Sequence, residues 1–228
     1  GTTVNGSISV GDNGDKVAVT KDNSVDVAAP DGYKWVDGET GQTLAKIVMV
    51  AEVNGKQYET LQEAIDAASK NQTVKLLNNT KENVTIAKAL TLDLNGKTLN
   101  GGQVKGTPAL TVTARVTVKD SSDAQTGKIM REDTSENSGV SSHYVIDVQG
   151  AGWLTVEGGN VINHSGTKEG KGASLVRVGD DSVEKYPGLN IKGGNFRQDN
   201  FIAIKVDRGD LFLNGGTITS ENSYAIEN

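Results

Sequence analysis

The sequence predicts an all-β protein: a right-handed single-stranded parallel β-helix with a short N-terminal capping α-helix and a small N-terminal β-sheet region. Three observations lead to this prediction. The composition is rich in glycine and poor in aromatic residues, short alternating segments end on glycine pairs, and these segments recur at a nearly regular spacing. With 28 glycines, 35% hydrophobic and 4% aromatic residues, narrow repetitive β structure fits better than a wide globular core.

The repeat is clearest in three segments that align without gaps: LTVEGGNVIN from Leu154, LNIKGGNFRQ from Leu189 and LFLNGGTITS from Leu211. Each alternates apolar and polar residues, which is typical of a strand with one buried face. Each then has a glycine pair, which allows a sharp backbone turn. Further short strands lie between these segments, so we expect about three strands per repeat: VIDVQG from Val145, LVRVGDD from Leu175 and AIKVDRGD from Ala203.

The spacing of the segments favours a β-helix. From Leu189 to Leu211 is 22 residues, close to the smallest circuit of three short strands and three bends, and the earlier coils carry insertions. Equivalent strands should stack in parallel about 4.8 Å apart and form ladders of inward residues. We expect Leu189, Ile191, Leu211 and Leu213 in these ladders. Leucine-rich repeats have similar periods, but their asparagine-leucine signature is missing.

We divide the chain at about residue 50. Residues 51–228 are predicted to form the β-helix, with a capping helix at about 60–70 that begins at the Thr60/Glu63 capping box and carries an apolar stripe. That stripe is placed to cover the open end of the first coil. Residues 1–50 contain short strands between glycine- and aspartate-rich turns, which predicts a small antiparallel β region, either a companion or the end of a preceding module.

Charge and composition exclude several classes of function. The net charge is −6 and the pI about 5.0, so nucleic acid and anionic lipid are poor partners. No apolar run is long enough to cross a bilayer, so we expect no membrane insertion by this segment. The absence of cysteine excludes disulfides, thiol catalysis and cysteine-ligated zinc. The chain ends at Asn228 in mid-coil, and we expect a monomer within a longer multidomain chain.

The stretch from Val50 to Gly102, VAEVNGKQYETLQEAIDAASKNQTVKLLNNTKENVTIAKALTLDLNGKTLNGG, resembles the opening of β-helix modules in large surface proteins of anaerobic Gram-positive bacteria. These modules belong to the pectate-lyase-like superfamily in its broad structural sense. The resemblance implies a parallel β-helix and a secreted, extracellular location at the bacterial cell surface. It implies less about activity, because the superfamily contains lyases, hydrolases, esterases, tailspikes and adhesins.

Ligand-binding residues are expected on the insertions and beside the repeat strands, because solenoid insertions gather on one face and a groove between them is the default ligand site. Aromatic rings can stack on the apolar side of a sugar. For Trp153, which directly precedes a repeat strand, partial burial in the core is the alternative. The candidates are Trp153, Tyr186, Arg131, Asp133, His143 and Lys168.

Catalytic alternatives centre on Arg177, Asp180 and Asp181. The aspartate pair is similar to the Asp-Asp motif of β-helix galacturonan hydrolases, but the Asn-Thr-Asp and Gly-His-Gly motifs of that family are missing. A lyase would need calcium to acidify the carbon-bound proton and an arginine or lysine as base. Ordinary surface salt bridges, and a solvated turn for the aspartate pair, explain these residues more simply. The two histidines, His143 and His164, lack metal-ligand spacing, so no metal site is predicted.

The function predicted from sequence is a non-catalytic, adhesin-like, cell-surface β-helix module that binds a glycan or surface polymer or displays loops. One alternative is a polysaccharide lyase or glycoside hydrolase acting on uronate-rich polysaccharide. A second is a rigid structural spacer. No cofactor is expected, and calcium enters only with the lyase alternative.

Overall fold

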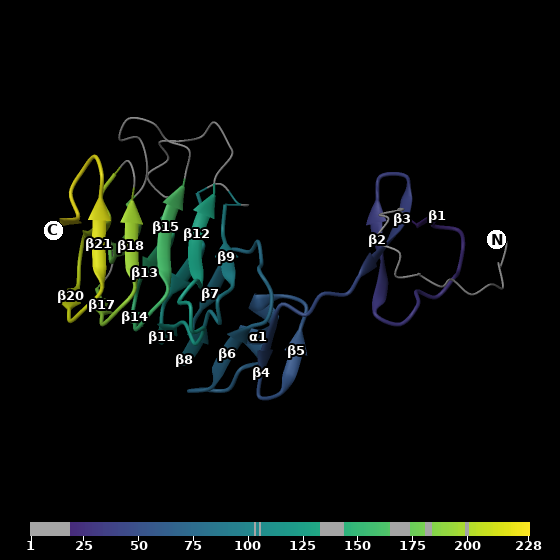
Figure 1. Ribbon diagram of the computed structural model, residues 1–228, viewed down its shortest axis with the longest axis horizontal. Coiled ribbons are helices and arrows are strands. Elements are labelled where there is room, and N and C mark those ends of the chain that lie inside the picture. The colour runs from purple at the N-terminus through teal and green to yellow at the C-terminus, as the bar shows by residue number, and fades with distance from the viewer. Residues whose placement is uncertain are drawn as a thin grey trace. The chain divides into compact units, whose positions relative to one another are not determined.

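The computed structural model describes residues 19–102, 104, 106–132, 144–164, 174–180, 184–198 and 201–228. The chain divides into two compact units, Gly1–Val48 and Met49–Asn228 (Figure 1). The described part of the first unit is a three-stranded antiparallel sheet in the order β1-β3-β2: β1 (Thr20–Lys21), β2 (Tyr33–Gly38) and β3 (Gly41–Lys46). In this sheet the indole nitrogen of Trp35 donates to the carbonyl oxygen of Val27 at 2.8 Å.

The second unit is built from three sheets whose strands stack in parallel from coil to coil (Figure 1). The first sheet contains β5 (Lys56–Tyr58), β4 (Ala51–Val53), β6 (Thr73–Leu76), β8 (Leu90–Asp93), β11 (Arg115–Lys119), β14 (Trp153–Val156), β17 (Gly188–Ile191) and β20 (Asp210–Leu213). In this sheet the pairings of β4 with β5 and β6 are antiparallel. All its other pairings are parallel.

The other two sheets are entirely parallel. The second sheet contains β9 (Thr98–Asn100), β12 (Lys128–Glu132), β15 (Asn160–His164), β18 (Asn195–Gln198) and β21 (Thr217–Ser220). The third sheet contains β7 (Val84–Ile86), β10 (Leu110–Val112), β13 (Ile146–Val148), β16 (Val176–Val178), β19 (Ile204–Val206) and β22 (Ile226–Glu227). From β8 onward, each coil contributes one strand to each sheet in turn, as the repeat predicts.

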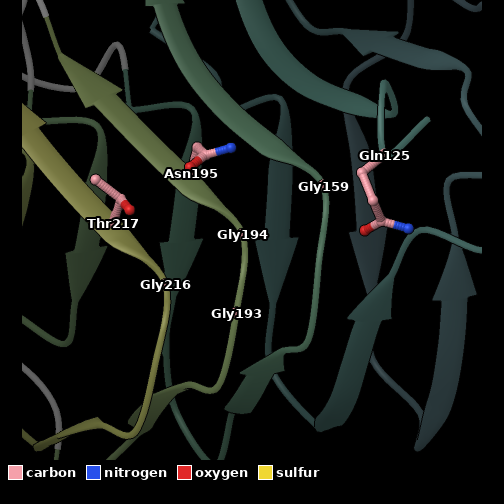
Figure 2. A pocket seen from close by; sticks show the side chains of 7 residues that line it. All are labelled: Gln125, Gly159, Gly193, Gly194, Asn195, Gly216 and Thr217. Carbon is pink, nitrogen blue, oxygen red and sulfur yellow. The ribbon is translucent and has the colours of Figure 1, made fainter. Parts of the chain in front are cut away.

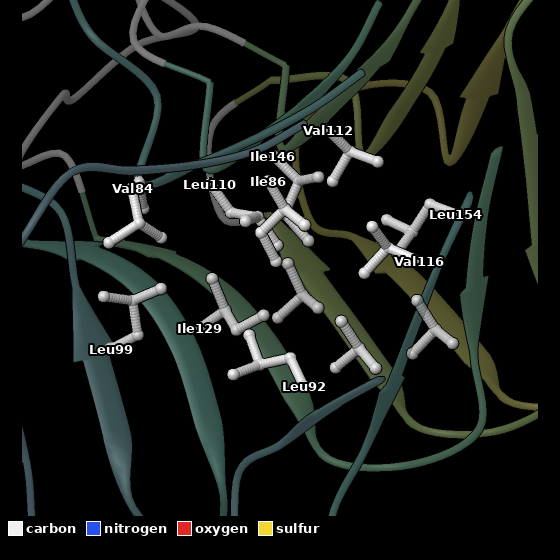
Figure 3. Close-up of a cluster of buried hydrophobic side chains, with 14 of the residues drawn as sticks. Val84, Ile86, Leu92, Leu99, Leu110, Val112, Val116, Ile129, Ile146 and Leu154 are labelled. Carbon is white, nitrogen blue, oxygen red and sulfur yellow. The ribbon is translucent and has the colours of Figure 1, made fainter. Parts of the chain in front are cut away.

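The interior is a narrow apolar core of stacked ladders (Figure 3). Alternation along each strand turns every second residue inward, and parallel pairing places equivalent residues directly above one another. Thus Val116 pairs with Leu154, and Leu154 with Leu189. The predicted fold class is confirmed: a parallel β-helix with a short N-terminal helix and a small N-terminal sheet.

The ladders end at β20, which is the outermost strand of the first sheet. Leu211 and Leu213 occupy the predicted register positions opposite Leu189 and Ile191. Leu213 is nevertheless 49% exposed, because no further described strand stacks on β20. The expectation that both leucines are core residues is therefore corrected for Leu213.

The predicted capping helix is α1 (Leu61–Ala67), which contacts β4 and buries Leu61, Ala64 and Ile65. The capping box is formed: Thr60 Oγ1 accepts from the Glu63 amide at 3.2 Å, and the Glu63 carboxylate accepts from the Thr60 amide at 3.2 Å. The helix is shorter than predicted because Ala68 is already extended, with ψ 136°.

Glycine pairs form the corners between the first and second sheets, where the coils are in very close contact. A Cβ atom on Gly193 would lie 2.4 Å from the Glu157 carbonyl oxygen, and one on Gly215 would lie 2.3 Å from that of Lys192. Because a side chain would clash with the neighbouring coil, the glycine pair of the repeat is a requirement of coil stacking.

An aspartate organises an equivalent corner in the earlier coils. The Asp120 carboxylate is buried and accepts amide N–H bonds from Gly96 at 2.8 Å, Ser122 at 3.1 Å and Gly127 at 2.6 Å. Burial raises the pKa of this carboxyl, but the three backbone donors outweigh burial and hold the pKa below its ordinary value. Asp120 therefore links two successive turns through its charged form.

Candidate ligand-binding face

Four of the residues singled out from the sequence lie outside the described residues: Asp133, His143, Lys168 and Asp181. The remaining candidates fall at three separate places. Arg131 lies inside the β-helix, Arg177 and Asp180 lie at the third sheet, and Trp153 and Tyr186 lie at the first sheet and the corner that precedes it.

Arg131 is fully buried on β12. Its guanidinium donates to the carbonyl oxygens of Val104 at 2.6 Å and Thr107 at 3.2 Å. These bonds tie a loop of the preceding coil to the second sheet. We therefore assign Arg131 a structural contribution and do not place it in the candidate site.

Arg177 is engaged by a carboxylate on the neighbouring coil. Its Nε donates to Asp147 Oδ1 at 3.0 Å and its terminal nitrogen to Asp147 Oδ2 at 2.8 Å, while the guanidinium lies 4.5 Å from the centre of the Tyr144 ring. Burial lowers the pKa of Arg177, but the hydrogen bonds and negative charge of Asp147 outweigh burial and raise the pKa above its ordinary value.

The negative charge of Asp180, three residues further along the chain, also favours the protonated form of Arg177 and so contributes to its raised pKa. The ion pair that the structure shows for Arg177 is the one with Asp147, at 2.8 Å. A guanidinium that holds its proton this firmly is poorly suited to abstract one from a substrate.

Trp153 lies on the outer face of the first sheet, because its neighbour Leu154 points into the core. The next strand has Gly188 at the paired position, and a Cβ there would lie 2.5 Å from the indole ring. The missing side chain lets the ring lie across β17 toward β20. Its centre is 5.8 Å from that of the Phe212 ring, with 37° between the ring planes.

The two rings and the residues beside them form a continuous surface on the first sheet. We call it the aromatic face and define it as Arg115, Trp153, Gly188 and Phe212. The Arg115 guanidinium lies 5.7 Å from the centre of the indole ring on the other side, and Phe212 is 47% exposed. The aromatic face therefore presents two rings side by side on a rigid sheet.

Polar groups lie beyond the aromatic face, on the same strands or on the residues that directly follow them. Asn214 Nδ2 donates to Asn190 Oδ1 at 2.8 Å, and Lys192 forms an ion pair with Glu157 at 3.5 Å. A surface with flat rings at one side and fixed amides and charges at the other can bind a molecule that has both apolar faces and many hydroxyls.

Tyr186 lies at the corner before β17, two residues ahead of Gly188. Its side chain is 67% exposed, and the Arg208 guanidinium lies 4.9 Å from the centre of its ring. Two residues of extended chain span at most about 7 Å, so the Cα atom of Tyr186 lies within that distance of Gly188.

A shallow polar pocket of about 350 Å³ lies at the other end of these strands, at the glycine corners (Figure 2). Its walls combine backbone with three polar side chains, and it is lined by Gln125, Gly159, Gly193, Gly194, Asn195, Gly216 and Thr217. The Asn195 amide donates to Asn160 Oδ1 at 3.2 Å, which fixes its orientation. Gly188 begins β17 and Gly193 lies in the corner after it, so their Cα atoms are at most about 18 Å apart.

Within the described ranges, no group of three or more histidine, cysteine, aspartate or glutamate residues is arranged to hold a metal ion. No helix in the part of the chain that the structure describes has the length and apolarity to span a membrane. Comparisons with protein-family models, curated proteins and solved structures give no match for this chain.

Sequence reasoning identified Trp153 and Tyr186 but missed Gly188 and Phe212. The signal for both is in the aligned repeats. Gly188 occupies the first position of β17, which Trp153 occupies in β14, and Phe212 stands where the two preceding coils have Thr155 and Asn190. An outward aromatic residue two coils from an outward tryptophan, with glycine between them, predicts a ring contact.

Proposed function

We propose that the chain is a non-catalytic, carbohydrate-binding β-helix module of an extracellular, adhesin-like bacterial surface protein. The observation that carries this proposal is the aromatic face, where Trp153 lies across Gly188 and approaches Phe212 on the outside of the first sheet. Sugar rings have an apolar side that stacks on such rings, and stacking is most effective when the rings are held rigidly.

The size of the surface fits an oligosaccharide. The strands carry the aromatic face near their start and the polar pocket beyond their end, and β17 between them spans three residue steps, about 10 Å. A chain of a few sugar rings would stack at the aromatic face, contact the amide of Asn190 on the first sheet, and cross the glycine corner to the amide of Asn195 on the second sheet.

The contacts and the stable positive charge of Arg177 favour a binding function over catalysis. In the lyase alternative this residue would serve as the base, yet its guanidinium is held in a two-point contact with Asp147 that favours its charged form. The negative charge of Asp180 favours the same charged form of Arg177 and so also raises its pKa. The uronate-directed alternatives therefore have less support than the aromatic face gives to sugar binding.

The test is a glycan-array screen of the wild-type chain, combined with an absorbance assay for unsaturated uronate release. We expect reproducible binding without product. The variant Trp153→Ala should raise the dissociation constant for the bound glycan by about tenfold or more, as for the central residue of a small interface.

The matched control is Tyr224→Ala, because Tyr224 is an exposed aromatic residue that precedes β22 of the third sheet. It should bind as the wild type does. Product release would contradict the proposal and support an enzyme. A chain that binds no glycan and releases no product would support the rigid spacer.

A further inference from the structure

The corner between β19 and β20 carries an Arg208-Gly209-Asp210 turn with two opposite, unpaired charges. Neighbouring charges on these coils are paired. Lys205 Nζ lies 2.8 Å from Asp207 Oδ1, and Arg177 forms an ion pair with Asp147. In the part of the chain that the structure describes, Arg208 has no carboxylate partner and Asp210 has no cationic partner.

The backbone of this turn is fixed to the preceding coil. The Arg208 amide donates to the Val178 carbonyl oxygen at 3.1 Å, and the Asp210 amide donates to that of Pro187 at 3.0 Å. Gly209 has a φ of +127°, and a Cβ there would lie 2.1 Å from the Pro187 carbonyl oxygen. Only glycine fits between the two charged residues, so the turn presents both side chains from a rigid frame.

The two side chains are accessible to a partner in different ways. Asp210 is exposed, whereas Arg208 is half-buried and stacks on the exposed ring of Tyr186. Its terminal nitrogen lies 3.5 Å from the tyrosine hydroxyl, and its Nε is shielded without a hydrogen-bond partner. Stacking on an exposed ring is a weak restraint, so the guanidinium can turn toward a stronger acceptor.

We propose that this turn is a docking surface for a receptor protein that presents a bound divalent cation and an acidic side chain. A carboxylate oxygen is a preferred ligand of magnesium and calcium, so Asp210 would complete the coordination of the cation. The Arg208 guanidinium would form a two-point contact with the receptor carboxylate. The two Cα atoms are at most about 7 Å apart, so one receptor surface can make both contacts.

The experiment measures binding of the full chain to an immobilised integrin ectodomain, a receptor that holds a divalent cation at its ligand site. We expect saturable binding in manganese, loss of binding in EDTA, and competition by a free Arg-Gly-Asp peptide. Asp210→Glu keeps the charge but moves the carboxylate outward, and it should weaken binding by about tenfold or more; Arg208→Ala should do the same.

The variant Trp153→Ala is the control, because it alters the aromatic face and leaves the turn unchanged. It should bind the receptor like the wild type, which separates this docking surface from glycan recognition. Asp210 is exposed and its side chain forms no hydrogen bond or ion pair with the described residues, so Asp210→Glu is expected to fold, and circular dichroism checks this. No binding of the wild type in manganese would overturn the proposal. Binding unaffected by EDTA or by Asp210→Glu would do so as well.

Discussion

At the residue scale, Gly188 controls the position of the candidate binding residue Trp153. A methyl group at this position would lie 2.5 Å from the indole ring, inside contact distance. We predict that Gly188→Ala displaces the ring, shifts its fluorescence maximum, and weakens glycan binding by about tenfold, because the sugar would lose a correctly placed ring.

The fluorescence measurement uses a Trp35→Phe background, since Trp35 is the other of the two tryptophans. The control is Gly150→Ala at a third-sheet corner, where an added Cβ meets no atom within 4 Å. An unchanged Trp153 spectrum in Gly188→Ala would show that the ring is not held against β17.

A second residue-scale prediction concerns Asp120. Its pKa is lowered in the folded chain by three backbone donors, so its charged form stabilises the fold above the unfolded-state pKa of about 3.9. That contribution is lost as the pH falls through the lower, folded-state pKa. We predict that Asp120→Asn lowers the free energy of unfolding at pH 7 by about 1 to 3 kcal/mol.

The same variant should show a weaker dependence of stability on pH in the acidic range. Urea unfolding at several pH values between 7 and 3 measures this. Asp123→Asn is the matched control, because Asp123 is exposed on the same turn and should change stability little. Parallel pH curves for Asp120→Asn and the wild type would count against the assigned role.

At the element scale, the glycine corners determine whether successive coils can stack. The three atoms nearest to a Cβ on Gly193 all belong to the coil before, and the Glu157 carbonyl oxygen would lie only 2.4 Å from it. We predict that Gly193→Ala lowers the free energy of unfolding by about 1 to 3 kcal/mol, because a packed backbone must move to admit the methyl group.

Thermal unfolding followed by circular dichroism measures this difference. Gly150→Ala again serves as the control: its φ of +59° strains an alanine, but there is open space around it. A smaller loss for Gly193→Ala than for Gly150→Ala would mean that backbone conformation, and not contact between coils, explains the glycine pairs.

Sequence patterns predicted the elements well where one pattern repeats. The alternation before each glycine pair gave the strands of the first sheet, and Thr60 with Glu63 gave the start of α1. The inward position of Arg131 was not predictable, since a charged residue at a strand end normally faces solvent. It is buried because the carbonyl groups of Val104 and Thr107, which are distant in sequence, accept its hydrogen bonds.

At the scale of the whole molecule, stability should reside in the β-helix unit. Its apolar ladders are buried except in the last coil, whereas no residue among positions 19–48 is buried. We predict that Leu154→Ala lowers the free energy of the main unfolding transition by about 2 to 5 kcal/mol. Trp35→Ala should leave that transition unchanged. Differential scanning calorimetry distinguishes these outcomes, and a comparable shift for Trp35→Ala would contradict this view.

The candidate binding surface was only partly predictable because it is made by neighbouring coils. Trp153 and Phe212 are 59 positions apart in the sequence and meet only because β17 between them has Gly188 on its outer side. Periodicity places each residue on a face of its strand, but the lateral contact depends on the register between coils and on the lengths of the insertions.

The most direct test of the proposed function is a fluorescence titration of the Trp35→Phe variant with an oligosaccharide identified on the array. Trp153 is then the only tryptophan, so its emission reports on the aromatic face alone. Sugar stacking on this ring predicts a saturable change in emission with the same dissociation constant that calorimetry gives. Glycan binding that calorimetry detects without any change in Trp153 emission would place the ligand elsewhere and contradict the central claim.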